Sequence, residues 1–353
     1  MKRITLSALL MTLFLLMSCG SGSTKTEDPK TTFLNSIANL GKGFLDVFTS
    51  LSDMVTGAFG IKAETKKSDI GKYFTDIADT MTSVKKKLNT VVAENGNYPK
   101  IKGVVDKFIT DTLDKIAEGA KEAAKGATGD VAIGNATSAG HGATPASKDS
   151  VVSLVKGFKT MVEVVLKKDE GNAGATKTGE YKKDIGKLFA DDNSKADAKE
   201  ENIAKASASV GSVTGADILQ AIAKSKEDPK VDNANGIEKA TDAAEISIAP
   251  AVNDKKEIKE AEAKKDAVIA AGIALRAMAK DGKFAANNNA KDANAVNGIA
   301  ANAVGKTLST LIIAIRNTVD SGLKTINDAL ATVTQEDNSV DSTTPAEAAT
   351  GGQ

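Results

Sequence analysis

The residue with the clearest chemical setting is Cys19, the single cysteine among 353 residues. It follows two basic residues, Lys2 and Arg3, and an apolar stretch over residues 4–16. A positive start, a short apolar stretch and a small residue before the cysteine are typical of a secretory signal. The stretch is too short for a membrane-spanning helix, which needs roughly 20 apolar residues. A single thiol also excludes an intramolecular disulfide, so we expect packing alone to hold the fold together.

The ending Leu16-Met17-Ser18-Cys19 resembles a bacterial lipobox. This resemblance implies cleavage after residue 18 and lipidation of Cys19, with a diacylglyceryl thioether on the sulfur and an N-linked acyl group. More than one acyl chain gives stable membrane anchoring, because each buried methylene contributes about 0.8 kcal/mol. An ordinary signal peptide with an incidental cysteine is the alternative, and it leaves the unpaired thiol unexplained. We therefore expect a lipoprotein signal peptide over residues 1–18 and a flexible tether over residues 19–30.

The other residues that could do chemistry form no recognisable site. The single histidine, His141, lies between two glycines without a second histidine or free thiol, which excludes a zinc site and Cys-His catalysis. Gly305-Lys306-Thr307 imitates the end of a phosphate-binding loop, but the glycine required five positions earlier is Ala300. No spacing of Asp and Glu distinguishes a carboxylate pair. The sequence predicts no enzyme and no catalytic, cofactor-binding or metal-binding residues.

The balance of charges bears on the partners. Lys and Arg together number 46, as do Asp and Glu, so the chain lacks the overall basic character of nucleic-acid-binding proteins. The densest basic spots are Lys85-Lys86-Lys87 and Lys167-Lys168. We interpret them as solvated helix faces and ends. The alternative is contact with sulfated or acidic polymers, which high salt would weaken.

Two long helices are expected to position everything else. Large apolar residues recur every three or four positions near both ends of the chain, at Phe33, Ile37, Leu40, Phe44, Phe48, Leu51 and Val55, and at Val304, Leu308, Leu311, Ile315, Val319, Leu323, Ile326, Leu330 and Val333. Such spacing marks one face of an amphipathic helix. The first helix should span residues 29–59. Each stripe is best buried against the other, so we expect an antiparallel pair with both termini at one end.

Shorter helices are predicted between them, over residues 70–92, 101–125, 151–166, 218–225 and 254–280. For the last, Asp254 and Glu257 resemble a start and Asp281-Gly282 a stop, and its apolar residues cover a broad, enclosed surface. Segments rich in small and polar residues predict surface loops at residues 126–149, 169–179, 191–202, 226–239 and 285–297. One short β-like run, residues 245–252, contains Pro250 and would be limited to a sheet edge.

These elements predict a mainly α protein with little or no β structure: an elongated helical bundle with two long antiparallel terminal helices and a loop-rich distal lobe. Residues 31–334 should form a single helical domain, and residues 335–353 a disordered tail. There is one internal repetition, because residues 69–74 and 184–189 share the pattern D-I-G-K-x-F. We interpret it as a reused helix start, with a duplicated subdomain as the alternative.

Several segments resemble a known family. The runs at residues 33–44, 69–74 and 153–159 look like the variable large proteins of relapsing-fever Borrelia, and residues 274–284 are similar to a constant segment of the related Lyme-spirochaete surface antigen. The resemblance covers nearly the whole chain and rests on the order of these motifs. None of them is by itself a signature of chemistry.

The resemblance implies a helical lipoprotein of the outer membrane, anchored through Cys19 and exposed on the cell surface. Such a protein acts in antigenic variation and evasion of host antibody, with the loops as expected antibody targets. Residues 276–284 should be a scaffold helix and its end, poorly accessible on intact cells. An adhesin that binds host glycosaminoglycans or extracellular matrix is the main alternative, and a periplasmic enzyme or transport component a distant one. The sequence leaves open whether the chain forms a homodimer and which membrane leaflet receives the anchor.

Overall fold

The computed structural model describes residues 29–50, 60–95, 98–179 and 181–334 of the chain. The signal peptide, Cys19, nearly all of the tether and the C-terminal tail lie outside the described residues. So does the predicted last part of the first helix, residues 51–59. Within the described ranges the chain is mostly helical, and its β structure consists of isolated bridges.

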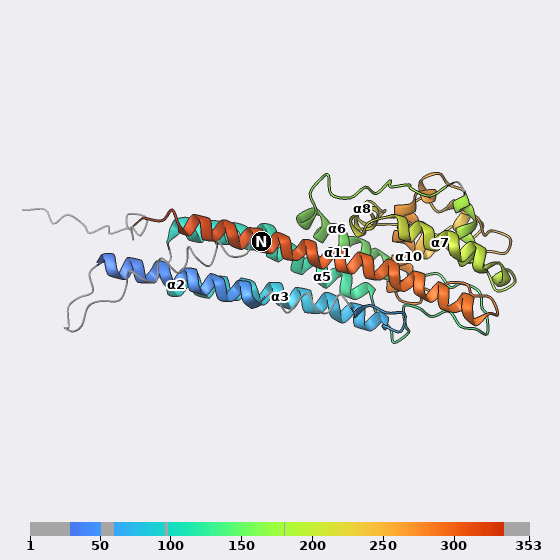
Figure 1. Cartoon of the computed structure of the whole chain (residues 1–353), viewed down its shortest axis with the longest axis horizontal. Helices are drawn as coiled ribbons and strands as arrows, with labels where there is room; N and C mark the ends of the chain where they lie inside the picture. The colour runs from blue at the N-terminus through green and yellow to red at the C-terminus, as the bar shows by residue number, and fades with distance from the viewer. Residues whose placement is uncertain (1–28, 51–59, 96–97, 180, 335–353) are drawn as a thin grey trace, which may run out of the picture.

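Two long helices run along the molecule in opposite directions. In Figure 1, α2 (Pro29–Ser50) starts at the same end of the molecule at which α11 (Ala290–Leu330) finishes. The apolar stripe of α11 is buried, and Leu308, Leu311 and Ile315 are each 0% exposed. This arrangement confirms the expected antiparallel pair.

The helix α11 starts earlier than expected, because residues 290–297 are helical and the loop predicted over residues 285–297 ends at Asn289. The Asn289 side chain accepts a hydrogen bond from the Lys291 amide at 2.9 Å and caps the first turn. Val296 and Ile299 continue the buried stripe backwards from Val304. By length and composition α11 could cross a membrane, but 56% of its most apolar window is buried inside the protein, as in a core helix.

Three further helices complete the frame beside α2 and α11. They are α3 (Lys67–Glu94), a helix formed by α4 (Pro99–Phe108) and α5 (Asp114–Gly126) joined through a π-helical turn η2 (Ile109–Leu113), and α6 (Lys148–Val165). These match the helices predicted over residues 70–92, 101–125 and 151–166. The helices α5 and α6 pack very closely, because a Cβ atom on Gly157 would lie 2.4 Å from the Gly119 carbonyl oxygen. Phe74 of α3 meets Phe158 of α6 edge to face at 5.5 Å.

The opposite part of the molecule is a lobe of short elements and loops (Figure 1). These elements are η3 (Tyr181–Phe189), η4 (Lys195–Asp197), α7 (Glu200–Ser212), α8 (Gly215–Ala223), η5 (Gly236–Lys239), α9 (Ala243–Ile248), η6 (Glu262–Lys264) and α10 (Asp266–Met278). Every residue of α10 is buried. We call this part the distal lobe, and its presence confirms the expected loop-rich end.

Three predictions for the distal lobe were wrong or incomplete. The helix predicted over residues 254–280 is helical from residue 266, because Asp254 has a φ of 59° and turns the chain beside the bridge between Val252 and Lys255. The first half of the β-like run over residues 245–252 belongs to helix α9, which Asp242 caps by accepting from the Glu245 amide at 2.9 Å. The helix α7 was not predicted.

Candidate functional site

The residues singled out for chemistry have structural roles or lie outside the described residues. Cys19 lies outside the described residues. His141 is partly buried in a loop, where Nε2 accepts from the Thr137 amide at 3.2 Å and Nδ1 donates to the Gly142 carbonyl at 3.1 Å. Burial lowers the pKa of His141, which favours this neutral form. Lys306 donates to the carbonyls of Val210, Gly211 and Val213 and thereby holds the end of α7.

Metal ligation finds no support in the described part of the chain, where no group of three His, Cys, Asp or Glu side chains could hold an ion. Two open grooves of about 490 and 510 Å³ lie along α5, and Glu227 of a distal-lobe loop also lines the first. Both are lined by side chains of opposite charge, and they share Glu118 and Glu122. The features that distinguish the molecule are therefore the loops of the distal lobe and the buried charges that hold them.

The C-terminal end of α10 is held by two buried cations. Lys67, at the start of α3, donates to four carbonyl oxygens at 2.6 to 3.2 Å, those of Arg276, Ala277, Ala279 and Gly282. Such contacts satisfy the last carbonyls of a helix, where the helix dipole also favours a positive charge. Burial and the neighbouring Arg276 nevertheless lower the pKa of Lys67 to about 7, against an opposing effect of Asp281.

Arg276 lies inside the lobe and is 0% exposed. Its guanidinium donates to carbonyls of the segments on either side, at 3.0 to 3.3 Å, namely those of Lys283, Ile246, Ser247 and Ala249. It also lies 4.9 Å from the ring centroid of Phe189, within the range of a cation–π interaction. Burial lowers the pKa of Arg276 to about 9. Arg276 therefore joins α10, α9 and η3, which agrees with the expected scaffold role of residues 276–284.

The N-terminal end of α10 carries a buried acid, Asp266, which is 0% exposed. Its oxygens accept hydrogen bonds from the amides of Lys177 and Thr178 at 2.6 and 2.8 Å, and from the hydroxyls of Thr178 and Ser209 at 2.7 Å. Lys182 lies 3.3 Å away as an ion-pair partner. Burial alone would raise the pKa of Asp266, but these donors outweigh it and the pKa is lowered.

A lysine just before each copy of the D-I-G-K-x-F pattern holds one end of α10. Lys67 and Lys182 each precede the aspartate of their copy by two residues, and each holds one end of α10. The first copy lies at the start of α3, but the N-cap residue is Lys66, and the predicted cap Asp69 is the third residue of the helix, where its side chain accepts from the Lys66 amide at 3.0 Å. The second forms the 3-10 helix η3 instead. Sequence reasoning recognised the repetition but missed the two lysines, whose partners are far away in the chain.

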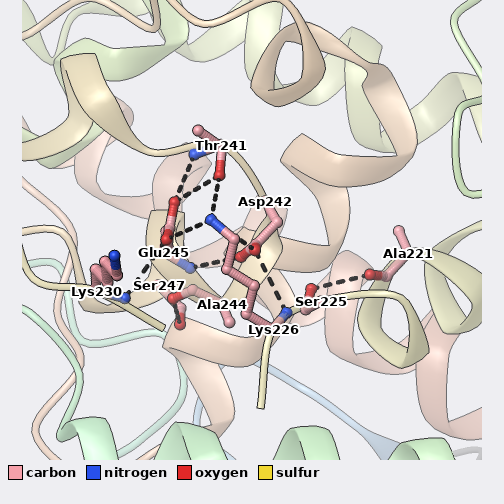
Figure 2. Close-up of polar contacts among 9 residues, drawn as sticks. All are labelled: Ala221, Ser225, Lys226, Lys230, Thr241, Asp242, Ala244, Glu245 and Ser247. Carbon is pink, nitrogen blue, oxygen red and sulfur yellow. Dashed lines mark hydrogen bonds and ion pairs between the residues drawn. The ribbon is translucent and has the colours of Figure 1, made fainter. Parts of the chain in front are cut away.

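The loops of the distal lobe expose their side chains, including those of residues 167–170, 176–177, 226–228, 230–231 and 233–234. Figure 2 shows how one loop is fixed to α9, with Lys226 and Thr241 converging on Glu245. Lys226 Nζ donates to Glu245 Oε1 at 2.7 Å, and the Thr241 amide donates to Glu245 Oε2 at 2.9 Å. Burial alone would raise the pKa of Glu245, but these bonds outweigh it and the pKa is lowered. Burial raises the pKa of the adjacent Asp242.

The lysine clusters do not form one basic face on the frame. Lys85 pairs with Asp114 at 2.8 Å, and the neighbouring Lys86 and Lys87 are exposed on α3. Lys167 and Lys168 are exposed just beyond the end of α6. The groove beside Lys85 also contains several acidic side chains. Adhesion to glycosaminoglycans stays the untested alternative, and homodimer formation stays open.

The fold therefore combines an elongated helical frame with a distal lobe whose exposed loops are supported by buried charges. The family model described as Borrelia lipoprotein matches residues 44–330, and the chain belongs to this family. It is 71% identical to Variable large protein 4 of Borrelia hermsii over 99% of this chain and 100% of that protein. It is 64% identical to Variable large protein 17 of the same organism, over 100% of this chain and 98% of that protein.

A solved structure gives the same fold. The variable surface antigen VlsE of Borrelia burgdorferi shares 34% sequence identity with a TM-score of 0.71, covering 84% of this chain and 97% of that chain. The resemblance to the variable large proteins and to the Lyme-spirochaete antigen is confirmed. The helical fold class and the membership of a Borrelia lipoprotein family are confirmed as well. The names of these relatives describe variable proteins, and that of VlsE a surface antigen, which is consistent with antigenic variation.

Proposed function

We propose that this chain is a variable surface lipoprotein, anchored in the outer membrane through acylated Cys19, that presents its distal loops to host antibody. Changes in the displayed loops allow evasion of the antibody response, and catalysis plays no part. The partners are the lipid of the outer membrane and host antibodies.

The observation that supports the proposal is where α2 starts and where α11 ends. The start of α2, close in sequence to Cys19, and the end of α11 lie at one end of the molecule, while the distal lobe lies toward the other (Figure 1). A lipid anchor at Cys19 would thus hold the molecule by its frame and leave the loops facing outward. Exposed loop side chains can usually change with little loss of stability.

The test combines two measurements on intact cells. Acyl labelling is compared between the wild type and Cys19→Ser, and external protease is applied to cells that express the wild type. We expect the label to be lost in Cys19→Ser and the wild type to be cleaved from outside. Label that persists in Cys19→Ser would refute the anchor, and a wild type that external protease leaves intact would refute surface exposure.

A further inference from the structure

Two buried acids, Asp217 and Asp266, bind the loop over residues 169–179 from the inside of the distal lobe. Asp217 belongs to the first turn of α8 and Asp266 to the first turn of α10, and they are 6% and 0% exposed. Each acid also binds a residue outside this loop. Asp217 accepts from the Thr214 amide at 2.9 Å, and Asp266 accepts from the Ser209 hydroxyl at 2.7 Å. They are therefore fixed parts of the helices inside the distal lobe.

Both acids bind the loop mainly through its main chain. Asp217 Oδ1 accepts from the Asn172 amide at 2.7 Å. Asp266 Oδ2 accepts from the amides of Lys177 and Thr178. The side chains of Asn172, Thr176 and Lys177 are exposed. Three amide groups make most of the contact between the two acids and the loop, and the Thr178 hydroxyl adds one bond to Asp266 at 2.7 Å. The exposed side chains named above take no part in these hydrogen bonds.

An amide N–H is present in every residue except proline. A carboxylate that accepts from amides therefore binds the loop without selecting its side chains. We propose that Asp217 and Asp266 are positioning residues that hold this loop by its main chain, so that its exposed side chains can change while its path stays fixed. The idea rests on the proposed display function for its biological meaning, but the contacts can be tested separately.

Hydrogen exchange of single amides in the full folded domain provides the test, with a matched pair of variants. Asp217→Ala removes the acceptor for Asn172 and weakens the α8 cap. Thr214→Ala weakens the same cap, because Thr214 Oγ1 accepts from the Asp217 amide at 3.1 Å, but it leaves the Asp217 carboxylate in place. Exchange of the Leu311 amide in α11 reports whether each variant is folded.

We expect the Asn172 amide to exchange at least about tenfold faster in Asp217→Ala, as for loss of a hydrogen bond to a charged group. In Thr214→Ala its rate should stay within about threefold of the wild type. Equal acceleration in both variants, or none in Asp217→Ala, would overturn the proposal, because the intact α8 cap or other contacts would then hold the loop.

A second comparison changes the loop instead of the helix that supports it. In the double variant Thr176→Ala, Lys177→Ala, the Thr178 amide should keep the exchange rate of the wild type within about threefold. In Lys177→Pro, which lacks one amide donor, that amide should exchange at least about tenfold faster. Similar acceleration in the alanine variant would show that the side chains hold the loop and would contradict the proposal. Neither result bears on surface exposure, which the protease experiment decides.

Discussion

Single residues show that the distal lobe uses its buried charges as supports for the main chain. Lys67 and Arg276 bind carbonyl groups, and Asp266 binds amides and hydroxyls. A charge buried in this way needs several well-placed dipoles, because burial without partners is costly. The sequence could not identify Lys67 and Asp266, because a lysine or an aspartate gives no local sign that its partners lie 57 to 215 residues away.

The pKa of Lys67 leads to a prediction about pH. Its pKa is about 7 in the folded protein and 10.5 in the unfolded chain, so between these values the unfolded chain binds the extra proton. The free energy of unfolding should therefore rise with pH in this window, by about 1.4 kcal/mol per pH unit from this group. Below pH 7 both states are protonated, and the contribution is constant.

The measurement is urea unfolding of the wild type and Lys67→Met at pH 6 to 9. From pH 7 to 9 the stability of the wild type relative to Lys67→Met should increase by about 2 to 3 kcal/mol. Lys86→Met replaces an exposed lysine of the same helix. Its free energy of unfolding should change with pH in the same way as that of the wild type. Parallel curves for the wild type and Lys67→Met would show that Lys67 stays charged throughout.

Among the elements, the close contact between α5 and α6 depends on glycine. A Cβ atom on Gly157 would lie 2.4 Å from the Gly119 carbonyl oxygen and 2.5 Å from the Ala123 amide nitrogen. Since both are main-chain atoms, Gly157→Ala must push the helices apart and should destabilise the fold by about 1 to 3 kcal/mol. Gly103→Ala in α4 meets open space and should be neutral or stabilising by up to about 1 kcal/mol. Thermal unfolding of both variants checks this prediction. Equal stability of Gly157→Ala and Gly103→Ala would contradict it.

The stripe of α11 gives the corresponding prediction for the long pair. Leu311 is 0% exposed, so Leu311→Ala removes buried methyl groups and leaves a cavity. The expected loss is about 2 to 5 kcal/mol in the free energy of unfolding, measured with urea. The nearby Ile313 is 45% exposed, and Ile313→Ala should change it by less than about 1 kcal/mol. A small loss for Leu311→Ala would argue against the assigned core face.

Element by element, the sequence predicted best where the apolar spacing is long and regular. The helices α3, α6 and α11 follow from such stripes, although the start of α11 depended on a cap at Asn289. The helix α7 was missed because alanine and serine dominate it, and Ile203, Ala206 and Val210 make only a faint stripe. The error over residues 254–265 arose because Asp254 resembles a helix cap but instead turns the chain with a positive φ. Lipidation of Cys19 stays a prediction.

At the scale of the whole molecule, the frame and the distal lobe divide the work of support and presentation. The helix α10 lies wholly inside, with Lys67 at one end and Asp266 at the other. An antibody raised against a peptide of residues 274–284 should therefore bind intact cells weakly and urea-treated protein strongly. Binding to live cells as strong as to unfolded protein would mean that α10 is accessible.

The central claim is that the distal loops, and not the frame, meet host antibody. The most direct measurement maps the contacts of neutralising antibodies on intact cells, using alanine substitutions at exposed positions of the loops, such as Lys177 and Asn233, and of the frame, such as Lys86 and Asn317. We expect most substitutions that abolish binding to lie in the loops of the distal lobe. A majority of contacts on α2, α3 and α11 would contradict it.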